Sequence, residues 1–132
     1  MSRSIACIDY RSGKIFIAKR QMVGDMGGRW EFPGGKIEEG ESPETALARE
    51  IREELATEIE VGKYIDTIEY DYPNFHLSMR CYECRVLSGK LELLEHENAA
   101  WLTADNLSSV KWLPADEMIM DTVASFLRSK NS

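Results

Sequence analysis

The sequence predicts one domain of the α+β class, rich in strands and with two principal helices. Three observations support this class. The length of 132 residues suits one compact hydrophobic core, because two domains of half that size would each bury too little apolar surface. Several stretches alternate apolar and polar residues, as half-buried strands do. Two further stretches carry the start signals or the apolar spacing of helices. We therefore expect residues 1–132 to form a single domain.

The N-terminal part of the sequence predicts a β-hairpin. Residues 2–9 and 14–20 alternate as strands do, and the turn at 10–13 between them contains a serine and a glycine. Three residues of the second strand are expected to face the core: Ile15, Ile17 and Ala18.

A loop and a short strand follow this hairpin. Residues 21–29 contain three glycines and little periodicity, which indicates a surface loop of the kind that often carries binding groups. Residues 30–32 alternate as a short strand. The Pro33-Gly34-Gly35 sequence after it predicts a sharp turn.

The start signals of the first helix agree with one another. Ser42 suits the N-cap, Pro43 the first helical position, and the acidic Glu44 the first turn near the positive end of the helix dipole. We expect this helix to end at about Leu55 or Ala56.

The second half of the sequence predicts another hairpin and the second principal helix. Two long strands are expected over residues 58–70 and 75–86, with the proline of 71–74 in the turn between them. Residues 98–102 indicate a short strand, after which Thr103 would cap a brief helix. The last helix is expected over 117–129, where four apolar residues recur at helical spacing: Ile119, Val123, Phe126 and Leu127.

Composition and charge exclude several classes of protein. Apolar residues make up 43% and charged residues 30% of the chain, as in ordinary globular proteins. No run of about 18 apolar residues occurs, and no signal peptide precedes the first strand, so we expect no membrane span and a cytoplasmic location. The net charge of −7 argues against binding a nucleic acid polymer, which requires clustered Lys and Arg. A small phosphorylated ligand stays possible, provided that divalent cations stand between carboxylates and phosphates.

The three cysteines do not indicate a metal site or a disulfide framework. An odd number of cysteines suits a reducing compartment. Cys81 and Cys84 are spaced as C-x-x-C within a predicted strand, where side chains three apart point to opposite faces. Because zinc requires a second pair of ligands, we expect ordinary core cysteines.

Three glutamates share one face of the first helix. Glu50, Glu53 and Glu54 fall within an arc of about 100°, and the adjoining arc is apolar. Like charges at this spacing cost about 0.2 to 0.5 kcal/mol per pair, whereas a hard cation such as Mg²⁺ would make them favourable. The alternative is a solvated acidic face that keeps the protein soluble. The upstream Gly34-Gly35 favours a metal site, because glycine lets backbone oxygens approach a ligand closely.

These residues resemble a known sequence pattern. Gly35, five residues, Glu41, seven residues and then residues 49–54 (REIREE) match the Nudix box. The pattern of that family continues with a glycine and an aliphatic residue, where this chain has Ala56 and Thr57. Since alanine in a left-handed helix end costs about 1 kcal/mol, we expect the helix to end differently or to run one residue longer.

The resemblance extends over nearly the whole chain and implies both a fold and a branch of the family. The implied fold is an α/β/α sandwich, with a mixed β-sheet flanked by the Nudix-box helix and a C-terminal helix. Residues 30–36, 69–76 and 113–116 resemble the MutT-like branch, whose members hydrolyse nucleoside triphosphates to monophosphates and pyrophosphate. That branch implies 8-oxo-dGTP as substrate, and a related bacterial branch implies CTP or modified pyrimidines.

The resemblance also implies roles for individual residues. Mg²⁺, or Mn²⁺ in its place, would be held by Gly34 through its carbonyl and by Glu50, Glu53, Glu54 and Glu95. Arg49 would orient Glu50 through a charge-assisted hydrogen bond. Four residues are implied in binding the substrate: Arg20, Lys36, Phe32 and Asp116. Of these, Arg20 would meet the phosphates and Asp116 would contact the base.

Several alternatives stay open at the level of sequence. Either Glu50 or Glu95 could take the proton from the attacking water, and an alignment slip would exchange Glu95 with Glu97. Asp116 could also be an ordinary N-cap. The substrate could instead be ADP-ribose, and the domain could be a nucleotide sensor without catalysis. We assign no role to the histidines, and we expect a monomer or a weak homodimer acting on a small nucleotide.

Overall fold

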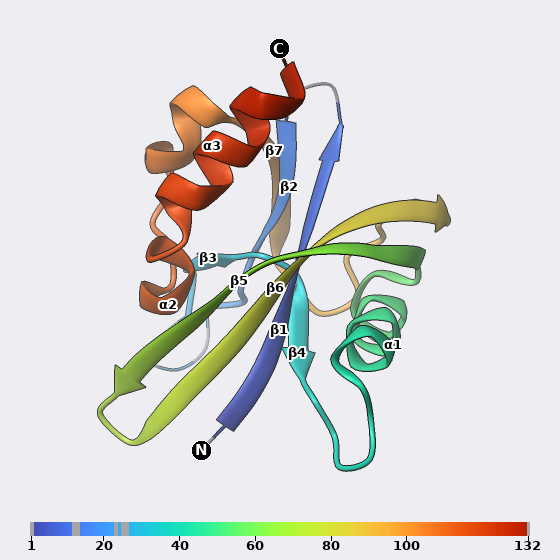
Figure 1. Ribbon diagram of the computed structural model, residues 1–132. Helices are drawn as coiled ribbons and strands as arrows, with labels where there is room; N and C mark the ends of the chain where they lie inside the picture. Colours follow the sequence, from blue (N-terminus) through green and yellow to red (C-terminus); the bar gives the residue numbers. More distant parts are fainter. Residues whose placement is uncertain (1, 12–13, 23, 25–26, 132) are drawn as a thin grey trace.

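The structure is a computed structural model that describes residues 2–11, 14–22, 24 and 27–131. A twisted sheet crosses the molecule between two groups of helices (Figure 1). Helix α1 (Pro43–Leu55) covers one face, and the 3₁₀ helix η1 (Ala104–Ser109), α2 (Pro114–Glu117) and α3 (Met120–Asn131) lie on the other. The expected α/β/α sandwich is confirmed.

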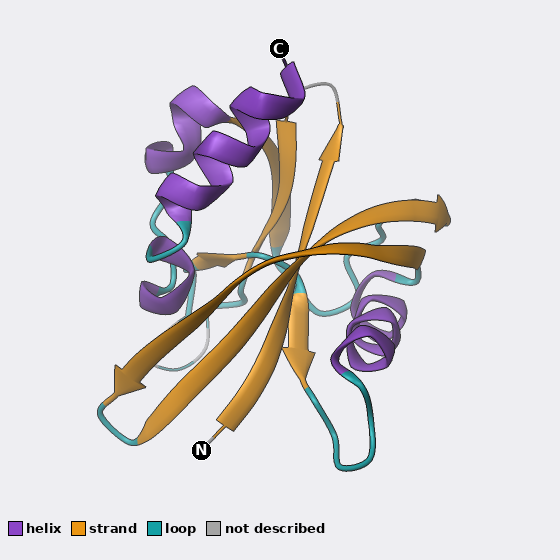
Figure 2. Cartoon of the chain, in the orientation of Figure 1, coloured by secondary structure: helices purple, strands orange, loops and turns teal. Residues whose placement is uncertain are grey.

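The sheet is mixed, as expected. Its strands are β1 (Ser2–Arg11), β2 (Lys14–Lys19), β3 (Trp30–Glu31), β4 (Gly34–Lys36), β5 (Glu58–Tyr72), β6 (Phe75–Ser88) and β7 (Asn98–Thr103). They run in the order β3-β2-β1-β6-β5, with β4 paired to β1 and β7 paired to β2. The β1–β6 pair is parallel, whereas the other pairs are antiparallel (Figure 2).

Two segments that the sequence indicated as turns belong to the sheet. Gly34, Gly35 and Lys36 form β4 opposite Ala6, Ile5 and Ser4 of β1. The second hairpin turn is narrower than expected, because Asp71 and Tyr72 extend β5 and pair with His76 and Phe75. Both strand segments depend on a pairing partner, which local composition does not reveal.

Helix α1 begins as expected and ends in an unexpected way. The Ser42 side chain accepts a hydrogen bond from the Thr45 N–H at 3.1 Å, and Pro43 is the first helical residue. Leu47, Ile51 and Leu55 are buried against the sheet. At the other end, Ala56 adopts the left-handed conformation with φ 49° and ψ 42°. The expectation of a different helix end is therefore wrong, since alanine occupies the position that favours glycine.

The opposite face of the sheet is covered by the C-terminal segment. Ile119, Val123 and Leu127 are fully buried there, beside Ile15 and Ile17 of β2. The expected single helix over 117–129 is in fact two, since α2 ends at Glu117, a turn follows at 118–119, and α3 begins at Met120. Within the part of the chain that the structure describes, no helix is both long and apolar enough to span a bilayer.

The two cysteines of β6 lie on opposite faces, as their spacing predicted. Cys81 packs in the cluster beneath α3, and Cys84 packs in the cluster beneath α1. Cys81 is a free thiol, whereas Cys84 is disulfide-bonded. The expectation that both are ordinary core cysteines is therefore wrong for Cys84.

Candidate active site

Arg49 forms a clamp at the start of the acidic face of α1. Its guanidinium makes a two-pronged contact with Glu41, with Nε 2.8 Å from Oε2 and Nη2 2.9 Å from Oε1. Nη2 also donates to the Lys36 carbonyl at 3.0 Å. These bonds join the loop before α1 to the helix, so the backbone of β4 is fixed relative to the glutamates.

The same arginine also holds two of the three predicted metal ligands. Nη1 lies 3.0 Å from Glu50 Oε1 and 2.8 Å from Glu53 Oε1. The Glu50 side chain packs against Gly35, where an added Cβ would lie 2.2 Å from Glu50 Oε2. A glycine is therefore required at this point of β4 for Glu50 to take its place.

Glu54 is the buried member of the acidic face. The residue is 8% exposed, and burial raises the pKa of its carboxyl group to about 9. The neighbouring charges of Glu31, Glu50 and Glu95 raise this pKa further, whereas a hydrogen bond from the Gly34 N–H lowers it. Its Oε1 is buried and has no hydrogen-bond partner among the described residues. Carboxylates from three separate segments thus surround one unmatched oxygen.

This donor set fits a hard divalent cation. The carboxylates of Glu31, Glu50, Glu54 and Glu95 gather here, and carboxylate oxygens are ligands that Mg²⁺ prefers. Among the described side chains, however, no three His, Cys, Asp or Glu groups already stand in a metal-binding arrangement. Glu50 and Glu53 are instead paired with Arg49. Binding a cation would require these two carboxylates to turn from the arginine.

Glu95 and Glu97 are separated clearly by their surroundings. Glu97 forms an ion pair with Lys19 at 3.1 Å. The charge of Glu95, in contrast, acts on Glu54. The geometry therefore favours Glu95 over Glu97 as the additional carboxylate.

Glu31 links the acidic face to the rest of the site, and sequence reasoning did not single it out. One oxygen of its carboxylate accepts from Arg20 Nη1 at 3.3 Å, and the other lies 2.8 Å from His96 Nε2. Its charge raises the pKa of both Glu54 and Asp116. In the sequence, Glu31 appears only as a polar residue of a short strand. His96 was likewise given no role, although it is buried.

Asp116 faces the sheet instead of capping a helix. Its Oδ2 accepts a hydrogen bond from the Phe32 N–H at 2.9 Å. The N-cap of α2 is Leu113, so the N-cap interpretation of Asp116 is wrong. Burial, and then the charge of Glu31, raise the pKa of Asp116 to about 8. Near neutral pH this carboxyl group holds a proton and can both donate and accept hydrogen bonds.

Aromatic side chains surround Asp116. Phe32 is buried, with its ring centroid 5.0 Å from that of Trp112. The Tyr72 hydroxyl accepts from the Ala115 N–H at 3.2 Å, and the Tyr72 ring stacks on Phe75 at 5.1 Å. These contacts place an apolar wall beside a buried carboxyl group.

Two of the predicted substrate-binding residues, Arg20 and Lys36, are exposed. Arg20 follows β2 and is exposed, with its guanidinium against Glu31. Lys36 is also exposed, at the end of β4. The structure thus brings together the three glutamates of α1, Glu95, Arg49 and Gly34, with Arg20 reaching them through Glu31.

Comparison with known proteins gives one consistent result. The family model described as "NUDIX domain" matches residues 5–122. A CTP pyrophosphohydrolase of Escherichia coli (strain K12) is 33% identical over 121 residues, which are 92% of this chain and 90% of that protein. An 8-oxo-dGTP diphosphatase of the same organism is 29% identical over 117 residues, 89% of this chain and 91% of that protein. The solution structure of the E. coli ORF135 protein has a TM-score of 0.84 and 30% identity, covering 100% of this chain and 94% of that one.

Proposed function

The chain belongs to the Nudix family and is a hydrolase of acid anhydrides, and on that premise we propose that it converts a nucleoside triphosphate to the monophosphate and pyrophosphate with Mg²⁺ as cofactor. The substrate is a small nucleotide and not a nucleic acid polymer, in keeping with the net charge of −7.

The observation that carries the proposal is the environment of Glu54. A buried carboxylate oxygen without a partner, surrounded by three other carboxylates, is unfavourable unless a proton or a cation is present. A divalent cation held by Glu50, Glu53, Glu54, Glu95 and the Gly34 carbonyl would supply that positive charge. When bound, Mg²⁺ or Mn²⁺ neutralises phosphate charge and lowers the pKa of a coordinated water.

The residues of the chain provide the remaining steps. Arg20 and Lys36 contact the phosphate oxygens and hold the triphosphate for in-line attack by water on the β-phosphorus. Glu50 or Glu95 takes the proton of that water. Arg49 keeps Glu50 and Glu53 in place between turnovers, since both are bonded to the same guanidinium nitrogen.

The base is selected at Asp116 and Phe32. The protonated Asp116 can donate to a ring nitrogen or carbonyl and accept from an exocyclic amine. The buried Phe32 lies beside it, since the Phe32 N–H donates to Asp116 Oδ2. These properties suit an oxidised guanine and a cytosine alike. The relatives named above act on one or the other, so we propose 8-oxo-dGTP or CTP and modified pyrimidine triphosphates as the substrate class.

A substrate panel tests the proposal. The protein is incubated with Mg²⁺ and the (d)NTPs, 8-oxo-dGTP or ADP-ribose, and the products are separated by ion-exchange chromatography. We expect monophosphate and pyrophosphate from one triphosphate, with Glu53→Gln lowering the rate at least about a hundredfold. Glu44→Gln, an exposed residue in the first turn of α1, serves as the matched control and should keep the wild-type rate. If only ADP-ribose gives products, the assignment of a triphosphate substrate is overturned. If no compound gives a product, the proposal that the protein hydrolyses these nucleotides is overturned.

A further inference from the structure

We propose that His96 is a positioning residue that holds Glu95 beside Glu54, by anchoring the loop at 89–97 to Glu31. The inference rests on the proposed function, because Glu95 is assigned to the metal site there. His96 itself would touch neither substrate nor metal.

The first argument is the burial and bonding of the imidazole. Its side chain is only 5% exposed, and Nε2 lies 2.8 Å from Oε2 of Glu31. Because a carboxylate oxygen only accepts, this contact places an N–H on Nε2. Nδ1 is buried without a partner among the described residues. Glu31 is thus the one hydrogen-bond partner of this imidazole among the described residues.

The second argument is the route of the loop that carries Glu95. Before Glu95, the N–H of Leu94 donates to the Glu54 carbonyl at 3.1 Å, which ties the loop to the end of α1. After it, the N–H of Glu97 donates to the Lys19 carbonyl at 2.9 Å, which ties the loop to β2. The Gln21 side chain holds the Glu95 carbonyl at 3.1 Å. The loop thus crosses from the helix to the sheet, and His96 inserts a buried side chain between these ties.

The third argument is the position of Glu31. The charge of this residue acts on Glu54, as does the charge of Glu95. His96 follows Glu95 directly in the chain. Its hydrogen bond to Glu31 therefore ties the loop at Glu95 to a side chain that lies beside Glu54. Without His96, the main-chain ties keep the loop attached, but the direction of the Glu95 side chain is no longer set by a buried contact.

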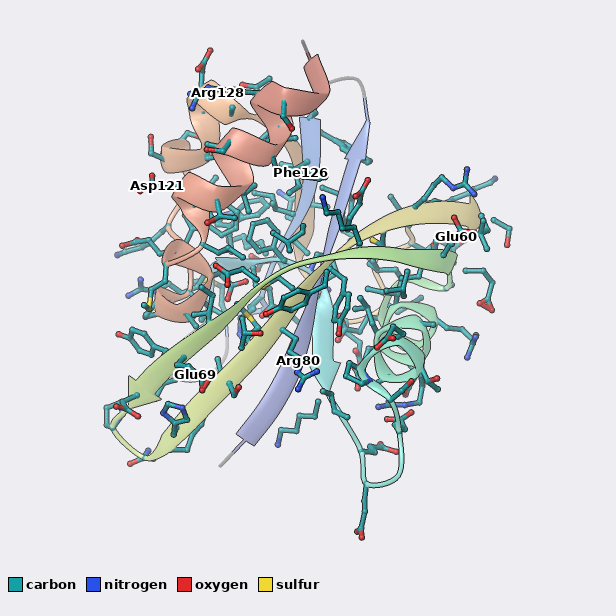
Figure 3. The ribbon with its side chains drawn as sticks, in the orientation of Figure 1. Glu60, Glu69, Arg80, Asp121, Phe126 and Arg128 are labelled. Atoms are coloured by element: carbon teal, nitrogen blue, oxygen red, sulfur yellow. The ribbon has the colours of Figure 1, made fainter. Side chains whose placement is uncertain are left out.

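The test uses His96→Leu, His96→Gln and a matched control. His76→Leu is the control, since His76 is bonded to Glu69 and Asp71 instead. Figure 3 shows Glu69 toward the tip of the β5–β6 hairpin, away from α1. The glutamine amide can occupy about the place of Nε2 and donate to Glu31, so His96→Gln should recover much of the loss and remains informative if His96→Leu does not fold.

Two quantities are measured for each folded variant: kcat and KM with the triphosphate that the wild type hydrolyses, and the Mn²⁺ dissociation constant by electron paramagnetic resonance without nucleotide. We expect His96→Leu to lower kcat by about 10- to 100-fold, with KM changed less than about threefold, and to weaken Mn²⁺ binding by about tenfold. His76→Leu should match the wild type in both. Wild-type kcat and Mn²⁺ affinity in His96→Leu would overturn the inference.

A double mutant separates this inference from the proposed function. If His96 acts through Glu95, His96→Leu combined with Glu95→Gln should be no slower than Glu95→Gln alone, within about twofold. Independent, multiplying losses would show that His96 acts elsewhere and would overturn the inference. If Glu95→Gln leaves kcat and Mn²⁺ binding unchanged, the assignment of Glu95 fails, and the inference fails with it. If the wild type binds Mn²⁺ but hydrolyses no triphosphate, the proposed function fails, while the Mn²⁺ titration of the His96 variants still decides the inference.

Discussion

Glu54 is the residue at which burial and charge conflict most strongly. Its carboxyl group has a pKa of about 9 and shares its surroundings with Glu31, Glu50 and Glu95. Without a cation, the group carries a proton near neutral pH, so an amide of the same shape can replace it. With a cation, the charged form is the ligand, and the amide cannot serve.

Glu54→Gln should therefore abolish function without weakening the fold. We expect a loss of activity of at least about a hundredfold and an unchanged or higher melting temperature in EDTA. The rise in melting temperature that Mg²⁺ produces by binding the folded state should also disappear. Scanning calorimetry with and without Mg²⁺ checks both statements. If Glu54→Gln is strongly destabilised in EDTA, the buried carboxyl group stabilises the metal-free fold, which contradicts this expectation.

Asp116 predicts a pH dependence of stability. Its folded pKa of about 8 exceeds the ordinary value of 3.8, so the folded protein holds a proton that the unfolded chain releases. The contribution of this group to the free energy of unfolding is fully present below about pH 4 and is lost as the pH rises through 8. Asp116→Asn keeps an oxygen for the Phe32 N–H and cannot ionise. We expect the free energy of unfolding of the variant to equal that of the wild type at pH 4 and to be higher by at least about 1 kcal/mol at pH 9. Urea unfolding in EDTA at the two pH values measures the difference; a constant offset would contradict the raised pKa.

At the scale of the element, the end of α1 predicts a stabilising substitution. Ala56 has a positive φ of 49°, a conformation that disfavours a Cβ. Ala56→Gly should raise the free energy of unfolding by about 0.4 to 1 kcal/mol and leave kcat unchanged, since Ala56 is exposed and carries no functional group. Chemical denaturation measures the gain. The same substitution at Ala46, which is fully buried inside α1, is the matched control and should destabilise by about 1 kcal/mol.

The elements also show why helix α1 was predicted from the sequence and strand β4 was not. Helix α1 follows from Ser42, Pro43 and the spacing of its apolar residues, all of which are local features. Strand β4 has no apolar alternation and exists because Gly34–Lys36 pair with β1. Its place in the sheet depends on a partner some thirty residues earlier in the chain, which propensity does not encode.

At the scale of the molecule, two apolar clusters share one sheet. One cluster lies beneath α1 and includes Leu47, and the other lies beneath α3 and includes Leu127. The aromatic pairs Phe16–Trp101 and Phe32–Trp112 lie in different clusters. Because β2 and β6 contribute residues to both clusters, we propose that the described residues unfold as a single unit.

This proposal predicts coupled loss of both layers. Leu127→Ala should cost about 2 to 5 kcal/mol, and the signals of tryptophans in either layer should change at one midpoint. Fluorescence and far-ultraviolet circular dichroism during urea unfolding check the coincidence, with Leu47→Ala as the counterpart on the other face. Separate midpoints for the two probes would mean that the layers form independent units.

The sequence by itself determined the class of the fold, the acidic helix and the family of reaction. These follow from short-range patterns: cap residues, apolar spacing, and the distances between Gly35, Glu41 and residues 49–54. Only the tertiary structure decided what surrounds these groups. Glu31 lies between Glu54, Asp116 and His96, and Asp116 bonds Phe32 from 84 residues away. Burial and long-range pairing set the charge state of Glu54 and Asp116. No local pattern encodes them, because they depend on which distant segments pack together.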